Sequence, residues 1–322
     1  MNHTVLVTGV GGNVGQGILR NIRRCAPEVR VVGTDVVAVT AGHHFCDRFH
    51  QVPPSHERSY RRSIVEACEK EAVDLIIPAT DAEAHHLGLL VERLPTLLAS
   101  PAEVTGMCLD KYLTGTRLQV AGVPFAQSVL PSDYRGQWSE VVVKPREGRG
   151  SRNIHHNPPD LRGFDDTYVV QPRLEGCEVT TAFYVLRDRR LLGSITLVRD
   201  LRNGMTDRCT VAGEYDKVVN AVIRKLVAGF EIRGPCNLQS IITANGDVVP
   251  FEINCRYSGT NSIRAHFGFD DVRYGLQEYL FHEDVEPPHV THGSAMRVYL
   301  DIIYPGQDLS KIEAGSEKSF LY

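Results

Sequence analysis

The sequence lacks an excess of basic residues, a long apolar segment and any pair of cysteines at metal-binding spacing. Its 35 Lys and Arg against 39 Asp and Glu give a formal net charge of −4, which disfavours nucleic acid as the main partner. No apolar run approaches the roughly 20 residues of a membrane helix, and a strand-like segment at residues 4–8 leaves no room for a signal peptide. The eight cysteines include no Cys-x-x-Cys pair, which is typical of reduced thiols. We expect a cytoplasmic protein with neither a membrane nor a nucleic-acid partner.

The chain of 322 residues exceeds what one hydrophobic core usually supports, so two or three domains are expected. Strand-like and helix-like segments alternate in the first hundred residues, which predicts a parallel, doubly wound α/β sheet. The predicted strands there are 4–8, 30–35, 73–78 and 97–100, and the predicted helices are 13–24, 59–71 and 81–92. A helix over 110–121 follows, with Asp110 placed to cap it.

The remainder of the chain is richer in strands and predicts an α+β region. Its predicted strands are 140–144, 168–171, 178–186, 191–200, 236–243 and 248–254, interrupted by helices at 215–229 and about 270–281. The domain boundary is expected near residue 102.

The first strand is followed by Gly9, Gly12 and Gly15, which open the first helix, and Asp35 ends the next strand. This arrangement is typical of a dinucleotide site, in which an acid accepts a ribose hydroxyl. The Gly-x-x-Gly-x-x-Gly spacing is that of extended short-chain dehydrogenases, which need a Tyr with a Lys four positions later. None of the twelve tyrosines has such a lysine. The motif therefore predicts the fold more firmly than the cofactor, and a NAD(P)-dependent epimerase or reductase stays as an alternative.

Two strands near residues 236–243 and 248–254 predict a β-hairpin, because Asn245-Gly246 between apolar runs is a strong two-residue type I′ signal. The resulting antiparallel register puts Gln239 opposite Glu252 and Asn237 opposite Asn254. Directly opposed Cβ atoms lie roughly 5 Å apart, so the four polar side chains share one face. The other face, which includes Phe251, is expected to be core.

The four oxygen-bearing side chains carry one negative charge and suit a hard cation such as Mg²⁺, which takes one or two carboxylates and completes its shell with water and phosphates. Arg256 follows one alternation later and suits a phosphate or carboxylate. As an alternative, the four polar side chains form the solvent-exposed face of an ordinary hairpin and bind no metal.

The segment from Glu140 to Pro145 predicts a strand that carries Lys144 near its end, and a loop with two glycines follows over residues 146–152. Such a loop can close over a polyphosphate with its backbone N–H groups. It is not a Walker loop, because the lysine precedes the glycines.

With these motifs the chain resembles the ATP-grasp superfamily, and within it the branch similar to the large subunit of carbamoyl phosphate synthetase. The resemblance implies a Rossmann-like pre-ATP-grasp domain over 1–102, a small ATP-grasp lobe over 103–170 and a large lobe over 171–322. It further implies that Lys111 and Lys144 bind the ATP phosphates beneath the loop of 146–152, which includes Gly148, Gly150 and Ser151.

The segment Gln171–Glu178 is similar to the family's hinge, so adenine would lie near Gln171 and Leu174 and the ribose near Glu178. The hairpin matches the family's metal motif, which makes Gln239, Glu252 and Asn254 the metal ligands and Arg256 a contact of the transferred phosphate. The sequence departs from the family's pattern at three positions: Cys255 stands in place of the usual Pro, Gln171 in place of a frequent acid, and Gln239 in place of the acid of many ligases. The chain length predicts a single ATP-grasp unit and excludes a full carbamoyl phosphate synthetase.

The resemblance implies an ADP-forming carboxylate–amine ligase that works through an acyl phosphate, with ATP and two Mg²⁺ ions, for which Mn²⁺ can substitute. Its partners would be a small-molecule acid and amine, with a homodimer as a possible assembly. Lys144, Arg256 and Arg202 are the expected catalytic residues, and the 258–260 loop would hold the acyl phosphate. Arg199 and Arg202 are read either as substrate-carboxylate contacts or as solvated strand-end charges. A non-catalytic ATP-binding module is a further alternative.

Asp81 follows the predicted strand 73–78, at the end where α/β sheets bind ligands. Capping of the next helix explains this residue equally well.

Overall fold

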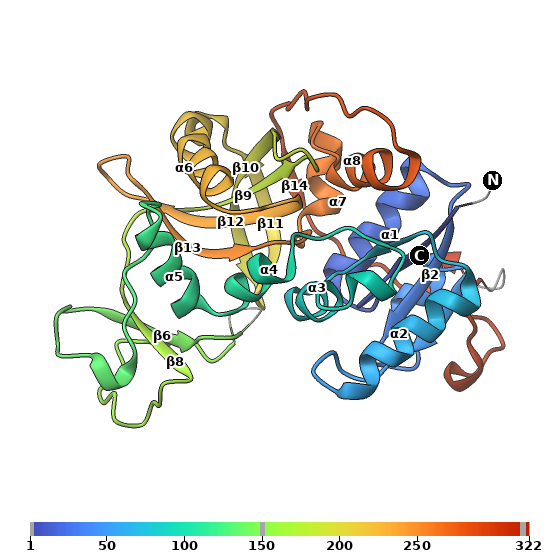
Figure 1. The fold of residues 1–322 in the computed structure, drawn as a ribbon, viewed down its shortest axis with the longest axis horizontal. Coiled ribbons are helices and arrows are strands. Elements are labelled where there is room, and N and C mark those ends of the chain that lie inside the picture. Colours follow the sequence, from blue (N-terminus) through green and yellow to red (C-terminus); the bar gives the residue numbers. More distant parts are fainter. Residues whose placement is uncertain (1–2, 149–151, 316–319, 322) are drawn as a thin grey trace.

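The computed structural model describes residues 3–148, 152–315 and 320–321. The molecule is elongated, with the N-terminal sheet at one end and a small sheet at the other (Figure 1). A larger antiparallel sheet lies between them. Within the described residues no helix combines the length and the apolar character that a bilayer crossing requires.

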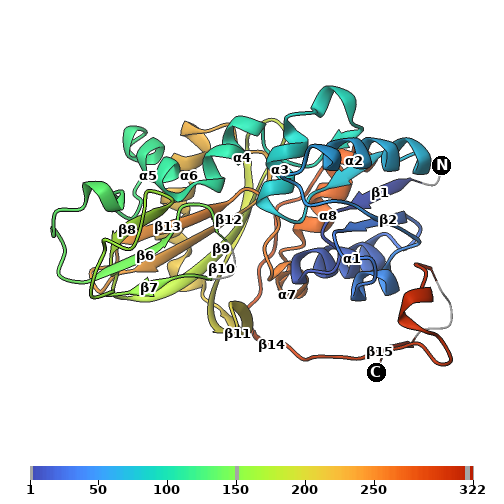
Figure 2. The same cartoon turned by 90° about the horizontal axis from the view of Figure 1, so that it is seen from below.

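The N-terminal sheet is parallel, with the strand order β3-β2-β1-β4-β5. Its strands are β1 (Thr4–Val7), β2 (Arg30–Asp35), β3 (Arg48–Gln51), β4 (Leu75–Ile77) and β5 (Thr96–Leu97). Figure 2 shows helices on both faces of this sheet, so the predicted doubly wound architecture is confirmed. The helices that follow its strands are α1 (Asn13–Cys25), α2 (Arg58–Glu71) and α3 (Asp81–Gly88). The sequence analysis missed β3, whose Arg-Phe-His-Gln sequence has no apolar alternation.

The central sheet is antiparallel, with the order β13-β12-β9-β10-β11-β14. Its strands are β9 (Cys177–Val185), β10 (Leu191–Arg202), β11 (Met205–Val211), β12 (Gly234–Ile242), β13 (Val248–Asn254) and β14 (Ser294–Met296). Helices α4 (Ala102–Leu109), α5 (Lys111–Val120) and α6 (Asp216–Gly229) pack their apolar side chains on one face. The opposite face is covered at one end by α7 (Asn261–Arg264) and α8 (Asp271–Leu276) with their connection.

The small sheet has the order β7-β6-β8 and consists of β6 (Val141–Pro145), β7 (His155–His156) and β8 (Tyr168–Pro172). A further two-stranded sheet joins β15 (Ile302–Ile303) to β16 (Phe320–Leu321). The short helical turns are η1 (Ala41–Phe45), η2 (Val91–Arg93), η3 (Pro131–Asp133), η4 (Gly213–Tyr215), η5 (Ala265–Phe267), η6 (Gln277–Phe281) and η7 (Leu309–Lys311).

The N-termini of α5 and α3 can be compared with the caps considered from the sequence. The Asp110 carboxylate accepts hydrogen bonds from the backbone N–H groups of Tyr112 and Leu113, so the predicted cap of α5 is confirmed. Of the two alternatives for Asp81, capping is excluded, because Thr80 precedes α3 and its hydroxyl accepts from the Glu83 N–H. The Asp81 carboxylate is therefore available for another partner.

Helix α1 packs closely against α7, which joins the N-terminal sheet to the segment after the β12–β13 hairpin. The Asn261 side chain donates to the Val14 carbonyl, and the Asn21 side chain donates to the Asn261 carbonyl. A Cβ atom on Gly17 would lie 1.9 Å from the Asn261 side-chain oxygen. Glycine at position 17 is required by this contact.

We expect Gly17→Ala to lower the free energy of unfolding by about 1–2 kcal/mol, because the clash outweighs the gain in helix propensity. Denaturant unfolding measures the change. Gly163→Ala is the matched control, since nothing lies within 4 Å of its Cβ position. Equal or greater stability of Gly17→Ala would show that this contact is not tight.

Candidate functional site

The β12–β13 hairpin brings together the polar pairs expected from the sequence, although its loop differs. Asn237 pairs with Asn254 and Gln239 with Glu252, as predicted. The predicted two-residue turn is wrong: Thr243 bonds to Asp247 across a three-residue loop in which Gly246 alone has a positive φ, of 82°. A bulge then shifts the register by one residue, which restores the predicted pairs.

The extra residue of this bulge is Phe251, because Ser240 pairs with Pro250 and Gln239 with Glu252. The sequence analysis assigned Phe251 to the core, and this is wrong. Its ring centroid lies 5.1 Å from the Lys144 ammonium nitrogen, and its carbonyl accepts a 3.4 Å hydrogen bond from the same group. The bulge thus joins the hairpin to the small sheet.

The polar face of the hairpin is linked by hydrogen bonds. The Asn254 amide donates to Glu252 Oε1 at 3.1 Å, and the Thr180 hydroxyl donates to Asn237 Oδ1 at 3.0 Å. Arg199 on β10 donates to Gln239 Oε1 at 2.7 Å. Glu252 supplies the only carboxylate among the four predicted residues, and the described chain contains no cluster of three His, Cys, Asp or Glu suited to a metal. A cation held here would need further anionic ligands from a bound molecule.

Two lysines from different elements lie beside this face, and both are buried. Burial, opposed by the charge of Glu252 and reinforced by that of Lys111, lowers the pKa of Lys144 to about 8. The Lys111 ammonium donates to the Gly148 carbonyl at 3.2 Å. Two buried cations next to one carboxylate form a site suited to a polyanion.

The start of the glycine-rich loop is fastened to the end of α4. The Arg146 guanidinium bonds both carboxylate oxygens of Asp110, with Nε at 3.0 and 3.2 Å. Gly148 follows within hydrogen-bond reach of Lys111. Gly150 and Ser151, which the sequence analysis also assigned to this loop, lie outside the described residues.

The predicted hinge connects β8 to β9. The buried Gln171 side chain donates to the Ser128 hydroxyl at 2.7 Å, and Leu174 is half-buried in the connection. Glu178 directly precedes the buried part of β9 and accepts from Arg199 at 3.3 Å. Arg199 therefore links the hinge glutamate to Gln239.

Arg256 lies at the exit of the hairpin and is held by the N-terminal sheet. Its Nε and Nη2 atoms donate to one Asp81 carboxylate oxygen at 3.0 and 2.8 Å. Asp81 begins α3 at the carboxyl end of β4, where α/β sheets bind ligands. No pattern in the sequence indicates that Arg256 is the partner of Asp81.

Two groups of predicted residues are not brought to this face. Arg202 is exposed at the end of β10, and none of its described contacts reaches the hairpin. The Ser258 and Thr260 hydroxyls accept hydrogen bonds of 2.7 and 2.9 Å from Arg264, whose charge is balanced by Asp271. These contacts stabilise the buried loop, and its role in holding an acyl phosphate stays a prediction.

Three buried cysteines that the sequence analysis did not connect lie beneath the hairpin. The Cys255 thiol is 3.3 Å from that of Cys108 and 3.6 Å from that of Cys236. Their spacing in the chain carries no signal of this proximity, because they come from α4, β12 and the residue directly after β13.

The N-terminal glycine motif is used by the fold. The Asp35 carboxylate, which would accept a ribose hydroxyl, accepts the Gly11 and Val37 N–H groups at 2.8 and 3.1 Å. A Cβ on Gly15 would lie 2.4 Å from the Gly9 carbonyl oxygen. These contacts favour a structural role for the motif over the nicotinamide alternative.

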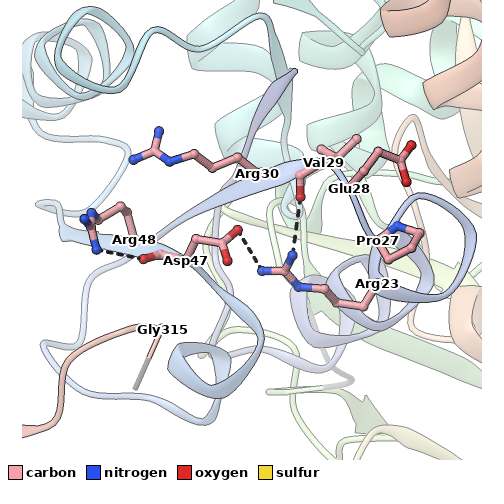
Figure 3. Close-up of a pocket in the computed structure, with 8 residues that line it drawn as sticks. All are labelled: Arg23, Pro27, Glu28, Val29, Arg30, Asp47, Arg48 and Gly315. Carbon is pink, nitrogen blue, oxygen red and sulfur yellow. Dashed lines mark hydrogen bonds and ion pairs between the residues drawn. The ribbon is translucent and has the colours of Figure 1, made fainter. Parts of the chain in front are cut away.

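A hollow of about 430 Å³ lies at the amino ends of the strands of the N-terminal sheet, near the starts of β2 and β3 (Figure 3). Arg23 points to Asp47 there and pairs with it at 2.9 Å. This edge is not where parallel sheets bind ligands, and the arginine already has its counter-ion.

Comparison with known proteins identifies the fold. Residues 5–95 match the family described as the PylC-like N-terminal domain. No curated protein matches the chain significantly.

Three solved structures illustrate the likeness. N5-carboxyaminoimidazole synthetase from Staphylococcus aureus, complexed with ADP, is 15% identical at a TM-score of 0.75, over 92% of this chain and 83% of that one. The biotin carboxylase domain of Hydrogenobacter thermophilus 2-oxoglutarate carboxylase, with MgADP, is 14% identical at a TM-score of 0.68, and the match covers 86% of this chain and 69% of that one. L-amino acid ligase from Bacillus licheniformis is 14% identical at a TM-score of 0.67, and the match covers 87% of this chain and 74% of that one. The chain has the ATP-grasp fold of these proteins, as predicted.

Asp110 both caps α5 and anchors Arg146, and two substitutions separate these roles. Asn remains a good cap, so we expect Asp110→Asn to cost about 1 kcal/mol through the lost ion pair. Asp110→Ala should cost about 2 kcal/mol, because the cap is lost as well. Urea unfolding at pH 7 compares them, and equal values for the two variants would contradict the division of roles.

Proposed function

We propose that this protein is an ATP-dependent ligase that joins a carboxylic acid to an amine through an acyl phosphate and releases ADP and phosphate. The convergence of Lys111, Lys144 and the Glu252 hairpin carries this proposal. These groups come from three separate elements of an ATP-grasp fold. Solved structures of the same fold contain ADP or ATP.

The two lysines would neutralise the phosphates of ATP, and the loop over residues 146–152 would exclude water above them. The adenine would lie against the hinge near Gln171 and Leu174, with the ribose at Glu178. The bond between Lys111 and the Gly148 carbonyl supports this reading, because it ties the loop to a phosphate-binding residue.

The oxygen donors of the hairpin fit Mg²⁺, which prefers carboxylate and amide oxygens. Glu252, Asn254 and Gln239 would hold it, with two ions bound alongside the nucleotide and Mn²⁺ as a substitute. The carbonyl oxygen of Gln239 keeps a second lone pair while it accepts from Arg199. Because the buried cations Lys111 and Lys144 lie beside the hairpin's one carboxylate, the metal should bind only together with the nucleotide. Bound there, it supplies charge neutralisation to the phosphates.

The reaction asks the protein mainly for positioning and charge neutralisation. The acid's carboxylate would attack the γ-phosphorus and release ADP, and the amine nitrogen would then displace phosphate from the acyl carbon. Arg256, oriented by Asp81, would stabilise the transferred group. Of the two arginines predicted as substrate-carboxylate contacts, Arg199 would take this role in place of Arg202, since its Nε atom is buried without a partner and its Nη2 atom contacts Gln239.

The domain limits at residues 102 and 170, a cytoplasmic location and a homodimer stay predictions from the sequence.

Product analysis tests the reaction directly. Acid and amine libraries should yield ADP and phosphate only when both substrates are present, and AMP with pyrophosphate would contradict the proposal. Glu252→Gln and Lys144→Met should each reduce turnover at least a hundredfold with the fold intact. Lys217→Met, on the exposed side of α6, is the matched control and should retain activity. Turnover that survives either site substitution would refute the assigned roles.

The pKa of Lys144, about 8, predicts a pH dependence. Lys144 is charged below this pKa and neutral above it, so phosphate binding should weaken as the pH rises through 8. We expect kcat/KM for ATP to fall by about tenfold per pH unit above that point. Steady-state rates from pH 6.5 to 9.5 measure it, and a flat profile to pH 9.5 would show that no group with a pKa near 8 controls the binding of ATP.

A further inference from the structure

Two arginines bond to the segment that follows the hairpin, at Gly259 and Ser262, and neither has an acidic partner within 4 Å among the described residues. They are Arg20 on α1 and Arg297 directly after β14. The two other arginines near Arg20 on α1 each have an acidic partner: Arg23 pairs with Asp47 at 2.9 Å, and Arg24 pairs with Asp270 at 2.5 Å. We call Arg20 and Arg297 the arginine pair.

Arg297 shares a face of the central sheet with the hairpin's polar residues. Arg199 pairs with Cys209, and Cys209 pairs with Ala295. The Arg297 N–H donates to the Asp207 carbonyl at 2.8 Å, which continues the ladder. Residues two apart in a strand face the same side, so Arg297 lies on the face of Arg199.

Each member of the pair is held near the loop that follows the hairpin. Arg297 Nη2 donates to the Gly259 carbonyl at 2.7 Å, and Arg20 Nη2 donates to the Ser262 hydroxyl at 3.1 Å. Burial lowers the pKa of Arg297, and the charge of Arg20 lowers it further. Burial also lowers the pKa of Arg20. Arg297 is therefore half-buried and lies near enough to the exposed Arg20 for the two positive charges to repel each other.

The start of α1 adds donors to the same place. Asn13, its first residue, lies so near Gly259 that a Cβ on that glycine would be 2.6 Å from the Asn13 amide nitrogen. Arg20 follows seven residues later, on the same side of the helix. The first turn of α1 contains no acidic residue.

We propose that the arginine pair, with Asn13, binds an anionic group of one of the two substrates, a carboxylate or phosphate that does not itself react. An anion there would offset the repulsion between two cations that both lack an acidic partner among the described residues, and arginine forms paired hydrogen bonds to both kinds of group. This inference rests on the proposed ligase function and narrows the substrate class. The preferred substrate would be an amino acid, a dicarboxylic acid or a phosphorylated compound.

The half-buried Arg199 lies between the pair and the hairpin in this arrangement. Both Arg199 and Arg297 lie near enough to Cys209 for their charges to act on its thiol. Arg199 Nε is buried without a hydrogen-bond partner. A substrate anchored at the pair would therefore extend along this face toward Glu252.

A binding experiment tests the site without any turnover. Malonate is titrated into the wild type at constant ionic strength, and its affinity is measured by calorimetry. We expect at least tenfold weaker binding in Arg20→Gln and in Arg297→Gln. Arg224→Gln, on exposed α6, is the matched control, and Lys144→Met excludes binding at the nucleotide's phosphate site; both should bind malonate as the wild type does. No binding by the wild type, or unchanged binding in both pair variants, would overturn the proposal.

A kinetic experiment identifies which substrate carries the anion. With an active acid–amine pair, Arg297→Gln should raise the KM of one substrate at least tenfold and leave the KM of ATP within twofold. Replacing that substrate's non-reacting anion by a carboxamide should have the same effect on the wild type and little further effect on the variant. An unchanged KM for both substrates would refute the proposal. Failure of every acid–amine pair to release ADP would instead refute the ligase function, while the malonate result would still decide the anion site.

Discussion

Phe251 is the extra residue of the hairpin, and its insertion decides which side chains face the phosphate-binding lysines. Without the bulge, the three-residue loop would set Gln239 opposite Phe251 and would turn Glu252 away from it. With the bulge, Glu252 and Gln239 are paired on one face, and the Phe251 ring and carbonyl both contact Lys144. A single backbone irregularity thus aligns the only carboxylate of the set with a cation from another sheet, as bulges beside functional sites commonly do.

The N-terminal sheet serves this site by packing and charge. Gly17 lets α1 approach Asn261 closely, and Asp81 holds Arg256 at the hairpin exit. Asp35 stabilises the glycine turn in which a dinucleotide would otherwise bind. A Rossmann-like domain that keeps its glycines can therefore act as a scaffold, since the same residues also permit tight helix packing.

The sequence predicted what short-range patterns determine. The α/β alternation, the Asp110 cap and the pairs Gln239–Glu252 and Asn237–Asn254 agree with the structure. The hairpin pairs agree because the loop and bulge errors cancel, not because the turn was right. Partners distant in sequence carried no signal: Asp81 is 175 residues from Arg256, and Arg297 belongs to a segment without strand periodicity. Such contacts depend on how the sheets pack, which local propensity does not encode.

The proposed ligase requires that the hairpin hold a metal beneath the nucleotide's phosphates. A crystal structure with Mn²⁺ and a non-hydrolysable ATP analogue tests it most directly through the anomalous signal of manganese. The account predicts a peak within about 2.3 Å of Glu252 and Asn254 oxygens, with the terminal phosphates against Lys144 and Lys111. Manganese located elsewhere, or an analogue bound at the Gly9–Gly15 turn, would contradict the account.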